Sequence, residues 1–520
     1  MKKRWIFCLL VVAMVLGMLS ACGGSDGTKE TESSGAISGI PDTETGEVVF
    51  TYARKETPQS MDIWGQSNVC NYIFFNLIYD QLICLDVVSG KYTPGLATEW
   101  TVSDDGCIYE FKIREGVKFH NGEDCTASDV VCNFQRVIDD TTLTRANLFS
   151  AMTSVEAVND YTVRFTLSEA NGYFMNLLAQ FPGAIPADYY AEKNGDIFNE
   201  NYGTGPWKFV SWDVSTGEMV FERNDAYWGE CTSNVDIIKY VAISEDATRV
   251  AAVRTGDVDM ADGIPADYLS NLESEGVAYD RTLAYDQIYA QFQNNGIFSD
   301  INARMAFNYA IDREAICAGI VMAGQAATWP TIEGTIGYSD TAEYAYKQDM
   351  EKAKDYLAKS SYNGEEIRLI GPQADYDHIT EVLTAIYGWM TEAGFNVKLE
   401  QLQSAAFTAA RKGGEYDIYI TGSTWTQGDG YIFLNQRVLG DSFSSNFAIP
   451  EVNNAIVESN SKVDYAERDA ALRTVYEKMM ENSNMSFIYT LEAIVAYQPN
   501  VKNVVFWGDK HTELRNVIVE

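Results

Sequence analysis

The sequence is poor in the residues on which most enzymes and metal sites rely. Only three histidines occur in 520 residues, and His120, His378 and His511 lie in different regions of the chain. No HExxH pattern is present, and the GxSxG match at residues 23–27 lies in a stretch of small and polar residues, not between a strand and a helix, so metallohydrolase and serine hydrolase chemistry lack their usual context. Acidic residues are numerous, but no pair stands at a spacing that marks a glycosidase. We therefore predict that the protein is not an enzyme and needs no metal or other cofactor.

Basic side chains are scarce as well. Lysine and arginine total 38 against 74 aspartates and glutamates, which gives a formal charge of −36. A field of this sign repels phosphate backbones and anionic lipid headgroups. The charge therefore argues against nucleic acid as a partner, and it favours solubility. A preference for cationic ligands is the alternative interpretation of the same charge.

Only one long hydrophobic run occurs, and basic residues precede it at positions 2–4. The run Trp5–Leu19 is shorter than the roughly 20 apolar residues that a membrane-spanning helix needs. This order is typical of a secretory signal peptide, which we predict for residues 1–21. The run ends in Leu-Ser-Ala before Cys22, which resembles the bacterial lipobox. That resemblance implies a lipid on Cys22, and two acyl chains give a stable membrane anchor. The alternative is an ordinary cleaved signal with an incidental cysteine.

Large apolar residues are also rare at residues 22–46, where Gly, Ser, Thr, Asp and Glu dominate. Such a composition buries too little surface to order itself, so we predict a flexible tether. With Cys8 removed and Cys22 lipidated, an odd number of cysteines remains without a CxxC pair, which suggests neither a zinc site nor a full disulfide framework. We expect most of them to be small core residues, and a pair between Cys125 and Cys132 stays open. The remaining cysteines are Cys70, Cys84, Cys107, Cys125, Cys132, Cys231 and Cys317.

What the sequence does contain is enough apolar and aromatic surface for more than one core. Hydrophobic residues make up 46%, with 31 Tyr and 24 Phe, and a chain of 520 residues exceeds what a single core organises. Alternating segments such as Tyr109–Ile113 predict a strand-rich α/β first lobe over residues 47–285, with a subdomain inserted at roughly 85–190. Helices and strands alternate afterwards, which predicts a second α/β lobe over residues 286–487. Two such lobes leave a cleft in which ligands tend to bind.

The second lobe gives the clearest predictions of single elements. Asp300 is predicted to cap a helix that reaches Ile320 and buries Met305, Tyr309, Ile316 and Ile320. Gly394 is predicted to end a later helix. Further helices are predicted at residues 349–359, 378–392 and 407–412, and strands at 367–370, 395–399 and 416–421.

Four stretches carry a recognisable order of residues. They are Leu96–Val130, Gly203–Gly229, Arg304–Glu314 and Arg468–Met480. Together they resemble the family of peptide and nickel solute-binding proteins that deliver ligands to ABC importers. The resemblance implies a two-lobed periplasmic-binding-protein type II fold of the α/β class, with a third subdomain inserted in the first lobe and a return to that lobe over residues 488–520. Because the glycines of these stretches set turns and their aromatics pack, they indicate the fold better than the ligand.

The segment Trp425–Leu434 bears on the ligand. Peptide binders of this family typically place an aspartate three residues after this tryptophan, and its carboxylate pairs with the α-ammonium group of the peptide. Here that position is Gly428, and Asp429 follows one residue later. The resemblance leaves two roles open for Asp429, ammonium recognition or a structural turn. Trp425 follows a predicted strand end, and its ring either packs on a ligand or fills the core. Weaker ligand-binding candidates, each with a structural alternative, are Gln427, Tyr431, Trp64 and Asn68.

The resemblance implies a substrate-binding lipoprotein of an ABC importer, which captures a small soluble ligand by hinge closure between its lobes. Family frequency favours a short peptide. The alternatives are a nickel or other metal chelate, an oligosaccharide, or a surface sensor that is not coupled to transport. No GxxxxGK[ST] phosphate loop occurs, so the expected partners are separate permease and ATPase subunits. We expect a monomer, held by its lipid on the outer face of the bacterial cytoplasmic membrane, on the extracellular or periplasmic side.

Overall fold

The computed structural model describes residues 46–56, 60–65, 70–86, 90–340, 344–425, 428–439, 449–508 and 510–520. The predicted signal peptide, Cys22, Asn68 and Gln427 lie outside these residues, as does nearly all of the predicted tether. The chain divides into residues 1–36 and 37–520, and the fold below is that of the second unit. Within the described residues, no helix is both long and apolar enough to cross a membrane.

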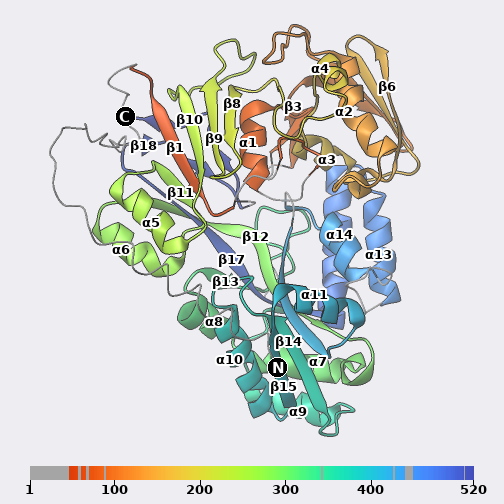
Figure 1. The fold of residues 1–520 in the computed structure, drawn as a ribbon. Coiled ribbons are helices and arrows are strands. Elements are labelled where there is room, and N and C mark those ends of the chain that lie inside the picture. Colours follow the sequence, from red (N-terminus) through yellow and green to blue (C-terminus); the bar gives the residue numbers. More distant parts are fainter. Residues whose placement is uncertain are drawn as a thin grey trace, which may run out of the picture. The chain divides into compact units, whose positions relative to one another are not determined.

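A mixed sheet of 11 strands forms the frame of this unit (Figure 1). Its centre is antiparallel, and parallel pairs lie toward both ends. We call the part built on β1 and β8–β11 the first lobe and the part built on β14–β16 the second lobe. In sheet order the strands are β15 (Asn396–Leu402), β14 (Glu366–Pro372), β16 (Ile418–Thr424), β12 (Ala278–Phe292), β17 (Met485–Tyr497), β11 (Met260–Asp262), β1 (Val49–Arg54), β10 (Ile237–Ala242), β9 (Glu218–Arg223) and β8 (Trp207–Asp213), and β13 (Gly324–Ala326) also pairs with β17.

The central strands β12 and β17 belong to both lobes. Val495–Tyr497 of β17 pairs with β11 of the first lobe, and Asp286–Phe292 of β12 pairs with β16 of the second. Between these two regions the pairing of β12 with β17 shifts register between Leu283 and Gln287. Bulges of this kind bend a strand and interrupt its ladder. We call this irregular stretch, together with the two strands, the hinge.

A second sheet of four antiparallel strands lies inside the first lobe's sequence. The helix α2 (Ala127–Asp139) packs against it, and the side chains of Thr126 and Asp129 form a capping box at the start of that helix. Phe134 of α2 packs edge-on against Phe165 of the sheet. The strands in order are β4 (Ala97–Val102), β5 (Ile108–Ile113), β7 (Thr162–Leu167) and β6 (Met152–Asn159), and β2 (Ile83–Asp86) and β3 (Lys91–Pro94) form a separate pair. The other helices of this lobe are α1 (Cys70–Ile78), α3 (Phe174–Gln180), α4 (Ala187–Glu192), α5 (Asp246–Thr255) and α6 (Leu269–Ser274).

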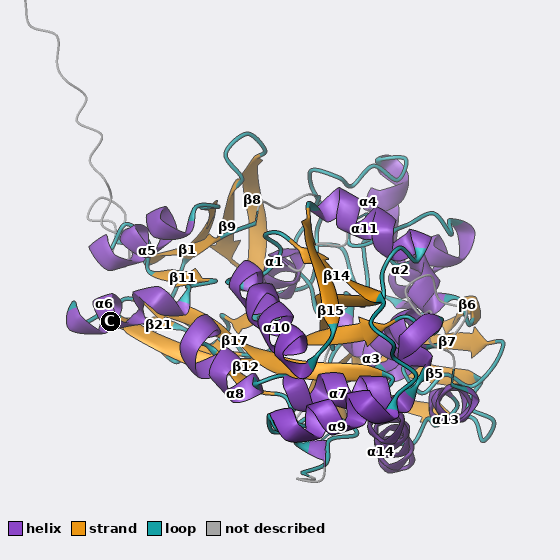
Figure 2. Cartoon of the chain, turned by 90° about the horizontal axis from the view of Figure 1, so that it is seen from below, coloured by secondary structure: helices purple, strands orange, loops and turns teal. Residues whose placement is uncertain are grey.

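The second lobe buries both faces of its sheet. Successive residues of a strand point to opposite faces, and accordingly Ile288 and Ala290 enter one core while Tyr289 enters the other. Helices α7 and α9, which pack together, lie side by side in Figure 2. The helices of this lobe are α7 (Ile301–Ala310), α8 (Arg313–Ile316), α9 (Met350–Lys359), α10 (Ile379–Ala393), α11 (Ser404–Gly413), α12 (Tyr431–Phe433), α13 (Pro450–Asn460) and α14 (Tyr465–Asn482).

The helix ends predicted from the sequence are partly confirmed. The carboxylate of Asp300 accepts a hydrogen bond from the Asn302 N–H at the start of α7, and Gly394 ends α10 with φ 108°. The prediction that the first of these helices reaches Ile320 is wrong, because α7 ends at Ala310. The carboxylate of Asp312 then caps α8 as a new helix.

The chain after β17 packs into the first lobe. It forms two short antiparallel pairs, β18 (Val501–Lys502) with β21 (Ile518–Val519) and β19 (Val505–Phe506) with β20 (Thr512–Glu513). Val501, Leu514, Val517 and Val519 are buried in the core of that lobe.

Candidate functional site

A small cavity lies where residues of the two lobes meet. Its volume is about 10 Å³, which is room for about one water molecule. The residues that line it carry no charged side chain, so the cavity favours an uncharged group over an ion. They are Leu85, Gly90 and Asn176 of the first lobe and Gly334, Thr335, Ile336, Gly428 and Tyr465 of the second.

Beside this cavity, Asp429 forms a buried ion pair with Arg468 of α14. The guanidinium donates from Nη2 to Oδ1 at 2.8 Å and from Nε to Oδ2 at 3.0 Å, and the two side chains are 3% and 1% exposed for Arg468 and Asp429. Arg468 also donates to the Ser459 carbonyl at 2.8 Å. Burial opposes the charge of Arg468, but the carboxylate outweighs burial and holds the pKa of Arg468 above its ordinary value. Oδ1 of Asp429 in addition accepts the Tyr431 N–H at 2.8 Å, at the start of α12.

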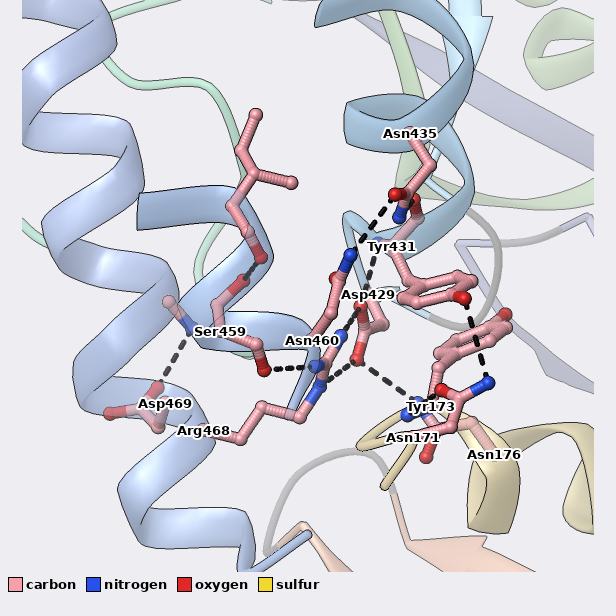
Figure 3. Close-up of polar contacts among 12 residues, drawn as sticks. Asn171, Tyr173, Asn176, Asp429, Tyr431, Asn435, Ser459, Asn460, Arg468 and Asp469 are labelled. Carbon is pink, nitrogen blue, oxygen red and sulfur yellow. Dashed lines mark hydrogen bonds and ion pairs between the residues drawn. The ribbon is translucent and has the colours of Figure 1, made fainter. Parts of the chain in front are cut away.

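The same carboxylate is in contact with the first lobe. Nδ2 of Asn176, on α3, donates to Oδ2 of Asp429 at 3.3 Å. One residue before α3, the ring of Tyr173 stacks on that of Tyr431 with centroids 4.9 Å apart and planes 6° apart. Figure 3 shows these side chains converging from the two lobes. Asp429 is therefore enclosed by protein on both sides, and an ammonium group would have to displace Arg468 or Asn176 to reach it.

Gly428 stands where a peptide binder of the resembling family carries its carboxylate. Its φ is 68°, a conformation that side chains other than glycine rarely adopt. A Cβ atom there would lie 2.9 Å from Cγ2 of Thr335, and the Ile336 N–H donates to the Gly428 carbonyl at 3.3 Å. The loop that carries Thr335 thus occupies the space beside Gly428, and this part of the cleft wall is neutral.

The two candidate tryptophans are packed in cores. Trp425 is 2% exposed, and its ring lies 4.2 Å from that of Phe433. Trp64 is 0% exposed, its ring lies 5.1 Å from that of Phe181, and its Nε1 donates to the Asn133 carbonyl at 3.1 Å. Neither ring presents a free face in this conformation, because core neighbours cover both. Of the candidates, Tyr431 is the half-buried aromatic residue at the meeting of the lobes.

Charged residues that were not among the candidates gather at the hinge and on the first-lobe strands beside it. Arg54, at the end of β1, pairs with Asp262, at the end of β11, with Nε and Oδ2 2.7 Å apart and exposures of 5% and 4%. The Tyr52 hydroxyl donates to the same Oδ2 at 2.9 Å. At the bulge of β12, Lys510 forms an ion pair with Asp286. Arg54 and Asp262 lie at strand ends, where ligands often bind in α/β folds, but each of the two cations is matched by a carboxylate.

The imidazole of His120 contacts backbone groups of the first lobe. Its Nε2 lies 3.0 Å from the Gly205 carbonyl, and the Gly203 N–H lies 3.4 Å from its Nδ1. Burial lowers the pKa of His120 to about 4, so the ring is neutral at pH 7. Among the described residues, no group of three or more His, Cys, Asp or Glu side chains is placed to hold a metal ion.

Several residues of this site escaped the sequence reasoning. Asn176 and Tyr173 belong to no motif, and nothing in the chain signals that they face Asp429. Arg468 opens the fourth family-like stretch, but its partner is 39 residues away and cannot be deduced from spacing. The available signal was that Arg468 falls on the same helix face as the apolar Leu472 and Val475.

Comparisons with known proteins agree on one family. Residues 91–445 match the family described as bacterial extracellular solute-binding proteins, family 5 Middle. Over 569 aligned residues the chain is 24% identical to the oligopeptide-binding protein OppA of Bacillus subtilis, covering 99% of both chains.

Solved structures show the same fold. HbpA2 from Haemophilus parasuis superposes with a TM-score of 0.82 at 21% identity, over 91% of this chain and all of the other. NikA from Brucella suis, solved in complex with Fe(III)-EDTA, superposes with a TM-score of 0.80 at 21% identity, over 90% of this chain and all of the other.

Proposed function

Because the chain belongs to the bacterial extracellular solute-binding proteins of family 5, we propose that it captures a small extracellular solute and delivers it to an ABC importer. The lobes close on the solute about the hinge, and the closed molecule is recognised by a permease whose ATPase subunit drives import. The observation that carries this proposal is the family match over residues 91–445 of a chain whose two lobes share β12 and β17. The protein acts by binding alone, as a monomer, and catalyses no reaction.

The ligand we propose is a short peptide. The similarity to an oligopeptide-binding protein over nearly the whole chain supports this choice. In this part of the cleft, however, position 428 is a glycine and the Asp429 carboxylate is paired with Arg468. Neither residue therefore offers a charge to a peptide ammonium group. We therefore propose that affinity depends little on that group.

A non-peptide solute is the second candidate. The neutral cavity wall favours it, and a structurally similar protein was solved with a metal chelate. A ligand without an ammonium group would suit the enclosed Asp429 equally well.

Two measurements separate these ligands. Mass spectrometry of the solute that co-purifies with the protein identifies its class directly. Calorimetry with Ala-Ala-Ala and with N-acetylated Ala-Ala-Ala then compares two ligands that differ in the ammonium group. We expect saturable binding of both, within about tenfold of each other, which is about 1.4 kcal/mol. Absence of binding to either peptide, together with a co-purified non-peptide solute, would replace the peptide by the second candidate.

We also propose that a lipid on Cys22 holds the protein at the outer face of the cytoplasmic membrane. The sequence before Cys22 supports this, and the charge of −36 offers no electrostatic route to an anionic membrane. Fractionation of cells that express Cys22→Ala should find the protein in the soluble exported fraction with its ligand affinity unchanged. Retention of that variant in the membrane fraction would contradict lipid anchoring.

A further inference from the structure

The loop before α3 and the turn between α13 and α14 meet across the lobes at backbone distance. The Gly172 N–H donates to the Asn460 carbonyl at 2.7 Å. A Cβ atom at position 172 would lie 2.0 Å from the Lys462 carbonyl oxygen and 2.8 Å from Nη1 of Arg468. The atoms nearest to that Cβ all belong to the second lobe. Glycine is therefore needed at position 172 only when the lobes are together.

Side chains extend this contact toward the cavity. The stacked rings of Tyr173 and Tyr431 and the hydrogen bond from Asn176 to Asp429 cross the same boundary (Figure 3). Figure 1 likewise shows α13 and α14 next to α3. A backbone hydrogen bond, an aromatic stack and a bond to a carboxylate each contribute modestly, and they act together because they share one interface.

Arg468 holds the second-lobe half of this contact in place. Its guanidinium fixes both oxygens of Asp429 and also the Ser459 carbonyl, one residue before Asn460. A planar guanidinium can orient a carboxylate and a carbonyl at once, whereas a lysine ammonium has no such fork. Arg468 does not line the cavity, so its action is to position Asp429 and the turn.

We propose that these residues form a clasp, which holds the lobes together on one side before any ligand is bound, with Arg468 as its positioning residue. The clasp consists of Gly172, Tyr173, Asn176, Asp429, Tyr431 and Asn460. The inference rests on the proposed function, in which the closed arrangement is the one that binds. If the clasp raises the closed fraction of the ligand-free protein, it raises apparent ligand affinity by the same factor.

Gly172→Ala tests the clasp directly, and Gly388→Ala is its matched control. An added Cβ at Gly388, an exposed position of α10, meets no atom within 4 Å. The protein is stripped of co-purified solute by unfolding and refolding. X-ray scattering of the stripped Gly172→Ala variant should give a larger radius of gyration than the wild type and the control. Hydrogen exchange in the peptide that contains Gly172 should accelerate at least about tenfold, as expected when one hydrogen bond is lost.

Two further variants keep the test decisive. Asn176→Ala removes a clasp contact without adding bulk, and it should expand the protein if Gly172→Ala fails to fold. Arg468→Lys keeps the charge but loses the fork, so it should accelerate exchange at Gly172 even where the melting temperature is little changed. A role in stability alone would not move exchange at a residue of the other lobe.

The outcomes for the clasp and for the proposed function are distinguishable. Unchanged scattering and unchanged exchange at Gly172 in the folded variants overturn the clasp, whatever the ligand is. Expansion of Gly172→Ala supports the clasp even if Ala-Ala-Ala binds to no form of the protein, in which case the peptide assignment fails alone. If Ala-Ala-Ala does bind, its affinity for Gly172→Ala should fall at least about tenfold while the control keeps wild-type affinity.

Discussion

The hinge and the clasp join the same two lobes by different physical means. At the hinge, β12 and β17 run through both lobes and share a ladder of backbone hydrogen bonds. Beside it, on the first-lobe strands β1 and β11, the ion pair between Arg54 and Asp262 is almost fully buried. Among the described residues, the contacts across the boundary at the clasp are a backbone hydrogen bond, an aromatic stack and two long side-chain hydrogen bonds, from Asn176 to Asp429 and from Asn171 to Tyr431.

Because of this difference, the stability of the fold and the closure of the lobes should depend on different contacts. Pulling β12 and β17 apart would break a continuous sheet, which requires unfolding. Separating the two halves of the clasp breaks no sheet and exposes surfaces that water can solvate. A glycine at the contact point, Gly172, lets the lobes approach without interlocking side chains there. We expect the hinge to govern the free energy of unfolding and the clasp to govern the population of the closed arrangement.

The largest expected effects come from removing a buried carboxylate at each place. Asp262→Ala and Asp429→Ala each leave a buried arginine unpaired, which should lower the free energy of unfolding by about 3–5 kcal/mol in urea denaturation. Only Asp429→Ala should also enlarge the ligand-free protein in X-ray scattering. Asp355→Ala, which removes an exposed pair with Lys359, is the control and should change neither quantity. Equal expansion of the Asp262→Ala variant would erase the distinction between hinge and clasp.

A smaller effect should follow from acid and should act on the first lobe without acting on the clasp. His120 has a pKa of about 4 in the folded protein against an ordinary value of 6.5. Between these values the unfolded chain binds a proton that the folded chain excludes, so stability is complete above pH 6.5 and falls as the pH drops toward 4. The loss is on the order of 3 kcal/mol.

Denaturation of the wild type and of His120→Gln across this pH range measures the loss. The variant should lack this part of the acid sensitivity. A wild-type curve parallel to that of the variant would show that His120 titrates normally in the folded state. At pH values at which the proteins are folded, the radius of gyration from X-ray scattering should not change with pH in either protein.

The smallest effect is expected at another contact between the lobes. Nε2 of His378, before α10, lies 3.5 Å from Oδ2 of Asp267 in the short helix η2 (Ala266–Tyr268), and the side chains are 29% and 45% exposed. Exposed pairs of this kind contribute at most about 1 kcal/mol. His378→Gln should therefore change ligand affinity by less than about fivefold in calorimetry. An expansion as large as that of Gly172→Ala would mean that the lobes are held on both sides.

Much of the second lobe could be predicted because its periodicity is strong. The helix predicted at residues 378–392 is α10, Ile379–Ala393, and the strand predicted at 367–370 lies within β14, Glu366–Pro372. The family resemblance and the two-lobed α/β fold are confirmed by the comparisons. The buried face of α7 was predicted less well. Met305 and Tyr309 are only partly covered, while Phe307 and the polar Arg304 are buried, because three backbone carbonyls accept hydrogen bonds from the guanidinium of Arg304.

The site was harder to predict, because its contacts join segments far apart in the chain. Asp429 was left open between two roles, since a carboxylate after a glycine fits a turn as well as a ligand. The structure adds the ion pair of Asp429 with Arg468, which local spacing does not reveal. Trp425 shows the same limit, because a tryptophan after a strand end is apolar enough for a core and flat enough for a ligand. Gln427 and Asn68 stay predictions, since they lie outside the described residues.

The course of the last residues bears on how the chain reaches its folded state. Arg515 pairs with Asp80 at 3.1 Å across a sequence separation of 435, and Tyr52 bonds to Thr512 across 460. Contacts of such high order form slowly, because a long loop must close before they can stabilise anything. The core near the beginning of the chain thus stays incomplete until the end has been synthesised. Slow folding suits a family of extracellular proteins, since a chain that is still unfolded can be exported across a membrane.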